Sequence, residues 1–528
     1  MPKTITFSNK KKLLIFLVIV TVVAALIRFY ELPYRQYWMV DEERDAFIVK
    51  KILVDKHPTL IGGALPGGFY LAPGYFYISA VFYYLSDLNP IGMGRVAATI
   101  SVISIPILFI IIKGMFNSKV AVLAALFYTF SYLTVIYNRT WWPLTFSPLV
   151  SIISYFSLFQ IVRTKNLKWF IPLTLALIVG VQSDPSNFSI LLTSIIVILF
   201  FRIPLKNFSV ALAIFLFIVS HIPLLIFDLR HNFLNSKAIL RFFSGQSGSG
   251  INFDPHILWD TLLLLPRNAV RFFWVFGDKD VAYQIHPSDV FINAKYSVIP
   301  GYMLYVTAAI LLIFLISSFR NSRKNSAVII ISLHIIISIL GIILHNFFFG
   351  SWTFEWILQI LFPAYAIVFS VVILYLVQRF KILRFPFVLI LILYLVFSLR
   401  TIITSPNSYN LQDKLNAVGF VASRLNNEDF SLDSIGKNFS WGGYRYLFYL
   451  FGHEPVRSYT DSAFSNWLYP QASTEHPDKV VVIVNHENLP DQNFNNQYQQ
   501  YLAKTYQKEK FGRIEVLIVD NSDKWIKW

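Results

Sequence analysis

Apolar runs of about 20 residues recur through the first 404 positions of this 528-residue chain. Each run is long enough to cross a bilayer hydrocarbon core of roughly 30 Å as a helix. The composition agrees, because 55% of the residues are hydrophobic and 14% are charged, whereas typical soluble domains carry about 25% charged residues. Residues 1–404 are therefore expected to form one α-helical polytopic membrane domain.

The net charge of +16 comes mainly from basic residues in short gaps between the apolar runs. Six such groups contain no acid: Lys3 with Lys10, Lys11 and Lys12; Lys113 with Lys119; Arg163 with Lys165 and Lys168; Arg202 with Lys206; Arg320 with Arg323 and Lys324; and Arg379 with Lys381 and Arg384. This placement is typical of cytoplasmic loops of membrane proteins. It argues against nucleic acid as a partner and predicts a multi-pass protein of the cell membrane.

Eleven spans connect these gaps in such a way that every acid-free basic group falls on the cytoplasmic side. They are expected at about 13–30, 94–112, 120–137, 144–162, 169–183, 187–201, 208–227, 298–318, 326–345, 355–377 and 385–404. The first run is longer than a signal-peptide core and is therefore expected to be an uncleaved anchor. An odd number of spans predicts an extracytoplasmic C-terminus. Cysteine is absent, so neither disulfides nor thiolate metal sites can form.

The first external loop, residues 31–93, is expected to hold two interfacial helices. The segment 41–56 has acids at its start and lysines further along, which favours a helix through its dipole. Ala46, Val49 and Ile52 give that helix an apolar stripe. The segment 74–85 offers only about a dozen uninterrupted apolar residues, too few for a span.

Two further segments are expected outside the membrane. Residues 228–297 contain the linker-like "SGQSGSG" at 244–250, and residues 236–256 are expected to be a mobile gate. After Thr404 the composition becomes polar, and the runs "KVVVIVN" and "RIEVLIVD" read as strands. Residues 405–528 are therefore expected to form a small extracytoplasmic α/β domain.

The ionisable residues near the expected outer surface are the candidate functional groups. They are Asp41, Glu42, Arg95, Arg139, Asp184, Arg230, His231 and Glu355. Charged residues near the membrane commonly mark function, but structural interpretations stay open. Asp41 and Glu42 could charge a helix N-terminus, and Arg95 and Arg139 could extend toward headgroups. Asp184 before Pro185 could begin a turn, and the segment "DLRH" at 228–231 could be an ion-paired loop entrance.

An extracytoplasmic site restricts the chemistry. Nucleotide sugars are made in the cytoplasm, so an outside transferase needs an activated group carried on lipid, such as a polyprenyl phosphate sugar. Arg139, Arg230 or His231 could stabilise the charge that grows on the departing phosphate, and these three residues together with Arg95 are the expected donor phosphate-binding set. A carboxylate such as Asp41 could accept the proton of an acceptor hydroxyl. Because phosphate leaves without protonation, the second acid of a glycosidase is not needed.

Several short motifs resemble those of the GT-C membrane glycosyltransferases, in particular the group of protein O-mannosyltransferases and lipid A aminoarabinose transferases. They are "VDEERDAFIVKKIL" in the first external loop, "GGFYLAPGYFYISAVFYYL" after it, "GRVAATISVISI" opening the second span and "VIYNRTWWP" after the third. The resemblance covers about 1–404. It implies a GT-C fold, Asp41 as catalytic base and a polyprenyl phosphate sugar as donor. Ala72-Pro73 replaces the usual double proline, and the acid that often follows the third-span arginine is absent.

The chain is thus expected to transfer a sugar from a polyprenyl phosphate carrier to a protein, lipid or glycan acceptor, with inversion. A divalent metal stays open, because some relatives bind one and no ligand set is readable here. The alternatives are a lipid or sugar transporter or flippase, and a non-catalytic scaffold. A transporter favours polar residues and broken helices near mid-membrane, where His334 and few others lie.

Overall fold

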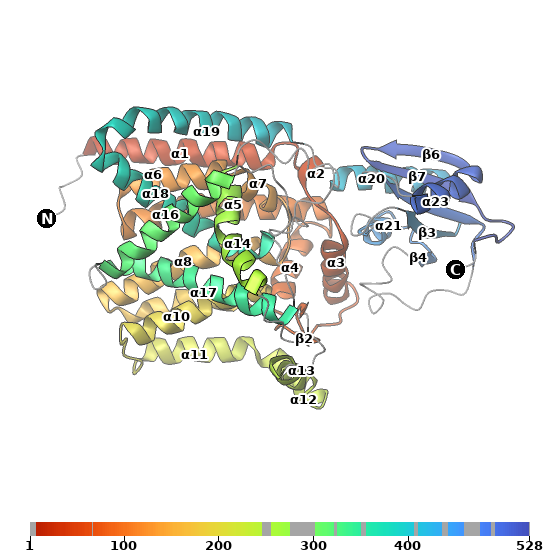
Figure 1. Cartoon of the computed structure of the whole chain (residues 1–528). Helices are drawn as coiled ribbons and strands as arrows, with labels where there is room; N and C mark the ends of the chain where they lie inside the picture. The colour runs from red at the N-terminus through yellow and green to blue at the C-terminus, as the bar shows by residue number, and fades with distance from the viewer. Residues whose placement is uncertain are drawn as a thin grey trace.

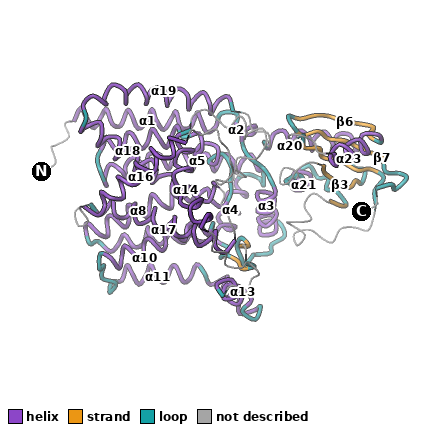
Figure 2. The backbone as a smooth tube through the Cα atoms, in the orientation of Figure 1, coloured by secondary structure: helices purple, strands orange, loops and turns teal. Residues whose placement is uncertain are grey.

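A helical bundle carries a smaller sheet domain at one end (Figures 1 and 2). The computed structural model describes residues 7–65, 67–244, 255–274, 301–320, 325–349, 355–405, 410–435, 442–458, 476–486 and 492–526. We call the end of the bundle next to the sheet domain the domain end. The opposite end, where helix α1 (Phe7–Phe29) starts, is the N-terminal end (Figure 1).

Each of the eleven expected spans is occupied by a helix or a pair of helices. After α1 these are α5 (Pro90–Met115), α6 (Ser118–Phe130) with α7 (Tyr132–Tyr137), α8 (Ser147–Thr164), α9 (Phe170–Ser183), α10 (Phe188–Phe200), α11 (Phe208–Ser220) with α12 (Ile222–Arg230), α16 (Gly301–Arg320), α17 (Ser326–Phe349), α18 (Phe362–Arg379) and α19 (Arg384–Thr404). In the described ranges, seven helices are long and apolar enough to cross a membrane, α11 and α12 form a bent pair at 42°, and α6, α9 and α10 belong to shorter apolar segments. The chain is a multi-pass membrane protein.

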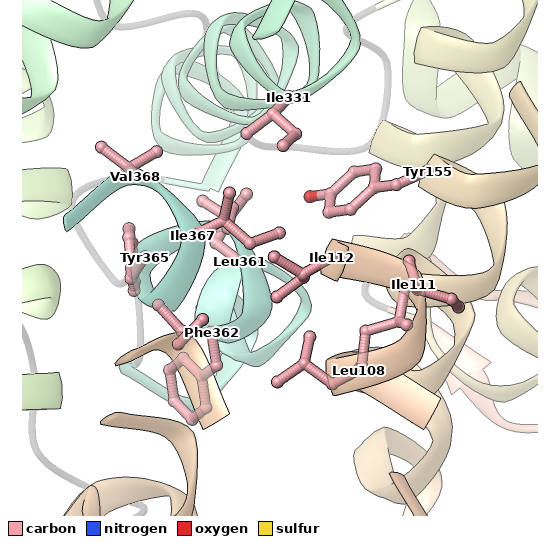
Figure 3. Packing of buried hydrophobic residues seen from close by; sticks show 14 of the residues in the cluster. Leu108, Ile111, Ile112, Tyr155, Ile331, Leu361, Phe362, Tyr365, Ile367 and Val368 are labelled. Atoms are coloured by element: carbon pink, nitrogen blue, oxygen red, sulfur yellow. The ribbon is translucent and has the colours of Figure 1, made fainter. Parts of the chain in front are cut away.

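The bundle interior is closely packed and apolar. Figure 3 shows Leu108 and Ile112 of α5, Ile331 of α17 and Ile367 of α18 directed toward one another, and these side chains are almost fully buried. Some polar groups at this depth are hydrogen-bonded, whereas others, such as the Tyr365 hydroxyl, have no partner among the described residues. His334 contacts the Tyr155 hydroxyl through Nδ1 at 2.5 Å and the Ser189 hydroxyl through Nε2 at 3.0 Å, so this deep histidine is a bonded part of the helix packing.

The segment expected as a second external loop contains helices that the sequence interpretation missed. Helix α13 (Leu234–Phe243) follows α12, and α14 (Pro255–Phe273) packs against α16 and α17. Pro266 and the charged Arg267 and Arg271 interrupt the apolar pattern of α14. The sequence pattern therefore does not predict this helix. The expected gate at 236–256 begins inside α13, and its residues 245–254 lie outside the described residues.

The first external loop holds the two predicted helices. After α2 (Leu32–Arg35) come α3 (Val40–Leu53), a hairpin of β1 (Ala64–Leu65) and β2 (Phe69–Tyr70), and α4 (Gly74–Leu85). The apolar stripe of α3 is covered by protein, because Ala46 and Val49 are fully buried and α3 packs against α4 and the sheet domain. Figure 1 shows α3 between the bundle and that domain.

The C-terminal residues form the expected α/β unit. Its elements are α20 (Leu411–Leu425), β3 (Phe430–Ile435), α21 (Arg445–Leu450), β4 (Arg457–Ser458), β5 (Lys479–Asn485), α23 (Gln492–Ala503), β6 (Thr505–Phe511) and β7 (Ile514–Asp520). The strand order is β4-β3-β5-β7-β6, with β4, β3 and β5 parallel and β7 and β6 antiparallel. Strands β5 and β7 coincide with the two predicted apolar runs and are buried along almost their whole length.

Glu43 of α3 links the bundle to the sheet domain. Its carboxylate accepts the backbone N–H of Gly443 at 3.0 Å and of Tyr446 at 2.7 Å. The Trp38 indole N–H donates to the Gly443 carbonyl at 2.6 Å, and Gly443 has a φ of +87° that side chains rarely adopt. Phe47 meets the Tyr446 ring edge-on at 5.1 Å. These contacts fix α3 against α21.

The cysteine-free sequence allows a clean test of sidedness. Lys119→Cys places a thiol at the N-terminal end, and Ser522→Cys places one on the exposed surface of the sheet domain. Because the basic gaps are expected inside, a membrane-impermeant maleimide should label Ser522→Cys in intact cells and Lys119→Cys only after lysis. The reverse labelling would show that the assigned orientation is wrong.

Candidate active site

The four acids at the start of α3 occupy four different environments. Asp41 is the exposed one: 70% of its side chain is accessible, and its Oδ1 accepts from Arg44 Nη1 at 2.8 Å. Glu43 contacts the sheet domain, while Glu42 and Asp45 are buried within the loop structure. Asp41 is therefore the carboxylate of this group that a substrate can reach.

Glu42 closes the N-terminus of α3. Its Oε2 accepts the backbone N–H of Met39 at 2.9 Å, which satisfies a donor that precedes the helix. Burial, together with the nearby charge of Asp41, raises the pKa of Glu42 to about 7. Its carboxyl group thus gains and loses a proton near neutral pH.

Asp45 holds Arg44 from the buried side of α3. Its Oδ1 accepts from Arg44 Nε at 3.0 Å and from Nη2 at 2.8 Å. Burial acts to lower the pKa of Arg44, but Asp45 and Asp41 together raise it above its ordinary value. Neither Arg44 nor Asp45 was among the residues predicted from the sequence, although both lie in the same motif.

Three arginines gather where several helices end at the domain end. Each donates to carbonyls in the last turn or at the C-terminal cap of a different helix: Arg28 Nη1 to Thr129 of α6 at 3.4 Å; Arg35 Nη1 to Ile402 and Ser405 of α19 at 3.0 and 2.8 Å; Arg139 Nη2 to Ile27 of α1 at 2.6 Å. The last carbonyls of a helix have no partner inside it, and cations there also complement the helix dipole. We call Arg28, Arg35 and Arg139 the arginine cluster.

The arginine cluster retains unused hydrogen-bond donors. Within the described part of the chain, Arg28 Nη2, Arg35 Nε and Arg139 Nε are buried and have no hydrogen-bond partner. Glu31, itself half exposed, forms an ion pair with Arg35 at 3.1 Å. Burial, followed by the repulsion of Arg35 and Arg28, lowers the pKa of Arg139 to about 9. Buried positive charge with free N–H groups favours the binding of an anion.

A buried ion pair lies close to this cluster. Arg271 of α14 contacts Glu355, with Nε–Oε2 at 2.5 Å, and the Tyr137 hydroxyl donates to the same carboxylate at 3.3 Å. Glu355 is 1% exposed and begins a 3-10 turn, Glu355–Leu361, that leads into α18. Arg271 was missed with its helix, whereas Glu355 was predicted without a partner. Removal of one member of such a pair leaves a buried charge unpaired.

Part of the predicted set lies together. The Tyr37 N–H donates to Thr140 Oγ1 at 3.0 Å, so the segment that leads into α3, and to Asp41, runs beside Arg139. Tyr137, two residues before Arg139, reaches Glu355. Asp41, Glu42, Arg139 and Glu355 are thus all at the domain end, on neighbouring elements.

The other predicted residues lie apart or have a local role. Asp184 caps the turn after α9 by accepting the Ser186 N–H at 2.8 Å, and burial raises its pKa. Arg95 is exposed in the second turn of α5. Arg230 and His231 are exposed at the end of α12, on the flank opposite α1 and α19 (Figure 1). The turn interpretation of Asp184 fits its contacts.

The described residues offer no set of ligands for a metal ion. Among the residues that the structure describes, no group of three or more His, Asp or Glu side chains is arranged to hold a metal ion. The chemistry that these residues can support is acid–base chemistry at Asp41 and anion binding at the arginines.

No protein-family profile and no curated protein matches this chain, but solved structures do. ArnT from Cupriavidus metallidurans bound to undecaprenyl phosphate aligns with a TM-score of 0.48 at 14% identity, over 95% of this chain and 97% of that one. The Archaeoglobus fulgidus oligosaccharyltransferase tethered with an acceptor peptide aligns with a TM-score of 0.52 at 10% identity, over 90% of this chain and 70% of that one. The latter likeness supports the GT-C fold, which confirms the expected fold class.

The raised pKa of Glu42 predicts a pH-dependent stability. The folded state keeps this proton up to about pH 7, whereas an ordinary glutamate releases it near 4.5, so folding loses stability as the pH rises between these values. The loss is on the order of 3 kcal/mol. Glu42→Gln should therefore flatten the fall in the melting temperature of the detergent-purified protein across this range. Asp55→Asn, an exposed acid beside Lys50, is the matched control, and equal slopes in all three proteins would refute the assignment.

Proposed function

We propose that this chain is an integral membrane glycosyltransferase that moves a sugar from a polyprenyl phosphate carrier to an acceptor at the domain end. The observation that carries the proposal is the combination of one reachable carboxylate, Asp41, with a buried arginine cluster that retains free N–H groups. The first provides a base and the second an anion site. The GT-C fold is consistent with this activity, but fold alone does not establish it.

The arginine cluster is proposed to bind the phosphate of the donor. Guanidinium N–H groups form charge-assisted hydrogen bonds with phosphate, and Arg28, Arg35 and Arg139 each keep one buried nitrogen without a partner where the helices end. As the anomeric carbon–oxygen bond breaks, negative charge grows on the leaving phosphate. Fixed positive groups in a low-dielectric site stabilise that charge without reorganisation.

Asp41 is proposed as the general base. Its carboxylate accepts the proton of the acceptor hydroxyl while the hydroxyl oxygen attacks the anomeric carbon from the face opposite the phosphate, so the configuration inverts. The oxygen–carbon bond forms as the carbon–phosphate oxygen bond breaks, and the lipid phosphate leaves as an anion. Arg44 holds Asp41 at 2.8 Å, which restricts the direction of the free carboxylate oxygen.

The remaining candidates receive supporting roles in this proposal. Glu42 caps and orients the helix that carries Asp41, and Glu355 holds Arg271. Arg95, Arg230 and His231 are exposed and are proposed to contact lipid headgroups, a role that suits long cationic side chains at an interface. Asp184 shapes a turn. The acceptor is a protein, lipid or glycan on the extracytoplasmic side of the cell membrane.

The placement of charge favours transfer over transport as the function. The proposed acid and cations lie at the domain end, while the deep His334 is bonded to Tyr155 and Ser189 in the packing. A transporter is expected to expose its polar site near mid-membrane. A transfer assay with purified protein, a labelled polyprenyl phosphate sugar and a membrane extract as acceptor tests the proposed activity.

Asp41→Asn is expected to remove nearly all transfer while the protein still folds. General-base catalysis contributes roughly 100 to 10,000-fold, and the amide keeps the shape of the carboxylate while it removes charge and basicity. Glu42→Gln is expected to reduce the rate less, because the amide oxygen can still accept the Met39 N–H. Asp41→Asn activity within a few-fold of wild type would contradict the role of Asp41 as base.

Arg139→Ala is expected to raise the donor KM and to lower kcat, because the guanidinium contacts the phosphate before and during the reaction. A hydrogen bond to a charged group contributes about 1.5–3 kcal/mol, which predicts roughly 10- to 100-fold in kcat/KM. Arg230→Ala should have a much smaller effect. Arg202→Ala, exposed at the N-terminal end, is the control for loss of a surface charge. Equal effects of all three substitutions would contradict the arginine cluster as the phosphate site.

A further inference from the structure

We propose that Asp45 is a positioning residue that fixes Arg44, and that Arg44 in turn fixes the carboxylate of Asp41. The inference rests on the proposed function of Asp41 as base, and it assigns a task to a buried acid that this function does not otherwise use. Asp45 does not reach substrate itself. It acts through one guanidinium group that two carboxylates share.

The contacts form an ordered series from the protein interior to the surface. The Asp45 side chain is 3% exposed, that of Arg44 is 28% exposed and that of Asp41 is 70% exposed. Asp45 Oδ1 accepts from Nε and Nη2 of Arg44, and Asp41 Oδ1 accepts from Nη1. Because two of its nitrogens are held by Asp45, the planar guanidinium can present Nη1 in only a narrow range of directions.

The buried end of this series is rigidly held. Ala46, next to Asp45, and Val49, one turn further along α3, are fully buried, and α4 and α21 pack against the helix. The groups that face Asp45 from α4 are Tyr75 and Tyr83, and Tyr446 of α21 in turn faces Tyr83. On α3 itself the ionisable neighbours are Asp41, Glu42 and Arg44. Arg44 is therefore the cation that compensates Asp45.

This arrangement solves a problem of an exposed base. A carboxylate with 70% exposure would otherwise sample several rotamers, and immobilising it at the moment of reaction costs free energy. The bond from Arg44 engages Oδ1 and leaves Oδ2 to meet the acceptor hydroxyl. If Arg44 were held by Asp41 alone, the two side chains would move together. The buried carboxylate of Asp45 holds Arg44 in place and thereby limits the movement of Asp41.

A double-mutant cycle separates positioning from general stabilisation. Asp45→Asn should lower kcat by roughly 10- to 100-fold, since a misplacement of about 1 Å can cost 100-fold, while the donor KM stays within about two-fold. In an Arg44→Gln background the same Asp45→Asn change should alter kcat by less than about two-fold. Equal losses of kcat in both backgrounds, or a wild-type kcat for Asp45→Asn, would overturn the proposal.

Three further measurements keep this test independent of folding and of the proposed activity. Asp45→Glu keeps the charge but displaces it, so its kcat should lie between those of wild type and Asp45→Asn. If the asparagine variant folds poorly, Asp45→Glu takes its place in the test. Asp55→Asn is the matched control on the same loop and should leave kcat unchanged. A cryo-electron-microscopy structure of Asp45→Asn should show Arg44 detached from Asp41; an intact contact would refute positioning. A detached Arg44 together with an inactive wild-type protein would instead count against the transferase function.

Discussion

The carbonyl groups at the ends of α1, α6 and α19 are the constraint around which the domain end is built. All three helices end on this side of the bundle, and their last carbonyls would be left unpaired in a medium that offers little water. Arg28, Arg35 and Arg139 supply the missing donors. The same solution concentrates positive charge in a small buried volume, which is the anion site that we propose.

Helix α3 joins this cationic region to the sheet domain. Glu43 contacts α21, Glu42 closes the N-terminus of the helix, and Asp45 holds Arg44. Three of the four acids are therefore used within the protein, and their separate partners explain how so many carboxylates can occur together beside a membrane span. Asp41, the remaining acid, is presented outward from a helix that both the bundle and the sheet domain hold in place. A chemical role for Asp41 depends on this support.

The sequence was sufficient for features that depend on local composition. Long apolar runs, the acid-to-base order along α3 and the apolar strands β5 and β7 each follow from periodicity and length, and the structure has them where they were expected. Helix α14 was missed because Pro266 and its charged residues interrupt the apolar pattern. Pairings between distant segments were not readable either, since Arg271 meets Glu355 across 84 positions. The motif around Asp41 contained Arg44 and Asp45, but only the structure shows which acid is buried.

The most direct test is whether the protein binds a polyprenyl phosphate more tightly than the same polyprenol without the phosphate. Native mass spectrometry of the purified protein with undecaprenyl phosphate and with undecaprenol compares two lipids that differ in that group alone. We expect the wild-type protein to retain the phosphate lipid at least about ten-fold better than the alcohol, a difference of about 1.4 kcal/mol in binding free energy. The double variant with Arg28→Gln and Arg139→Gln should lose this preference. Equal retention of both lipids by the wild-type protein, or an unchanged preference in the double variant, would contradict a phosphate site at the arginine cluster.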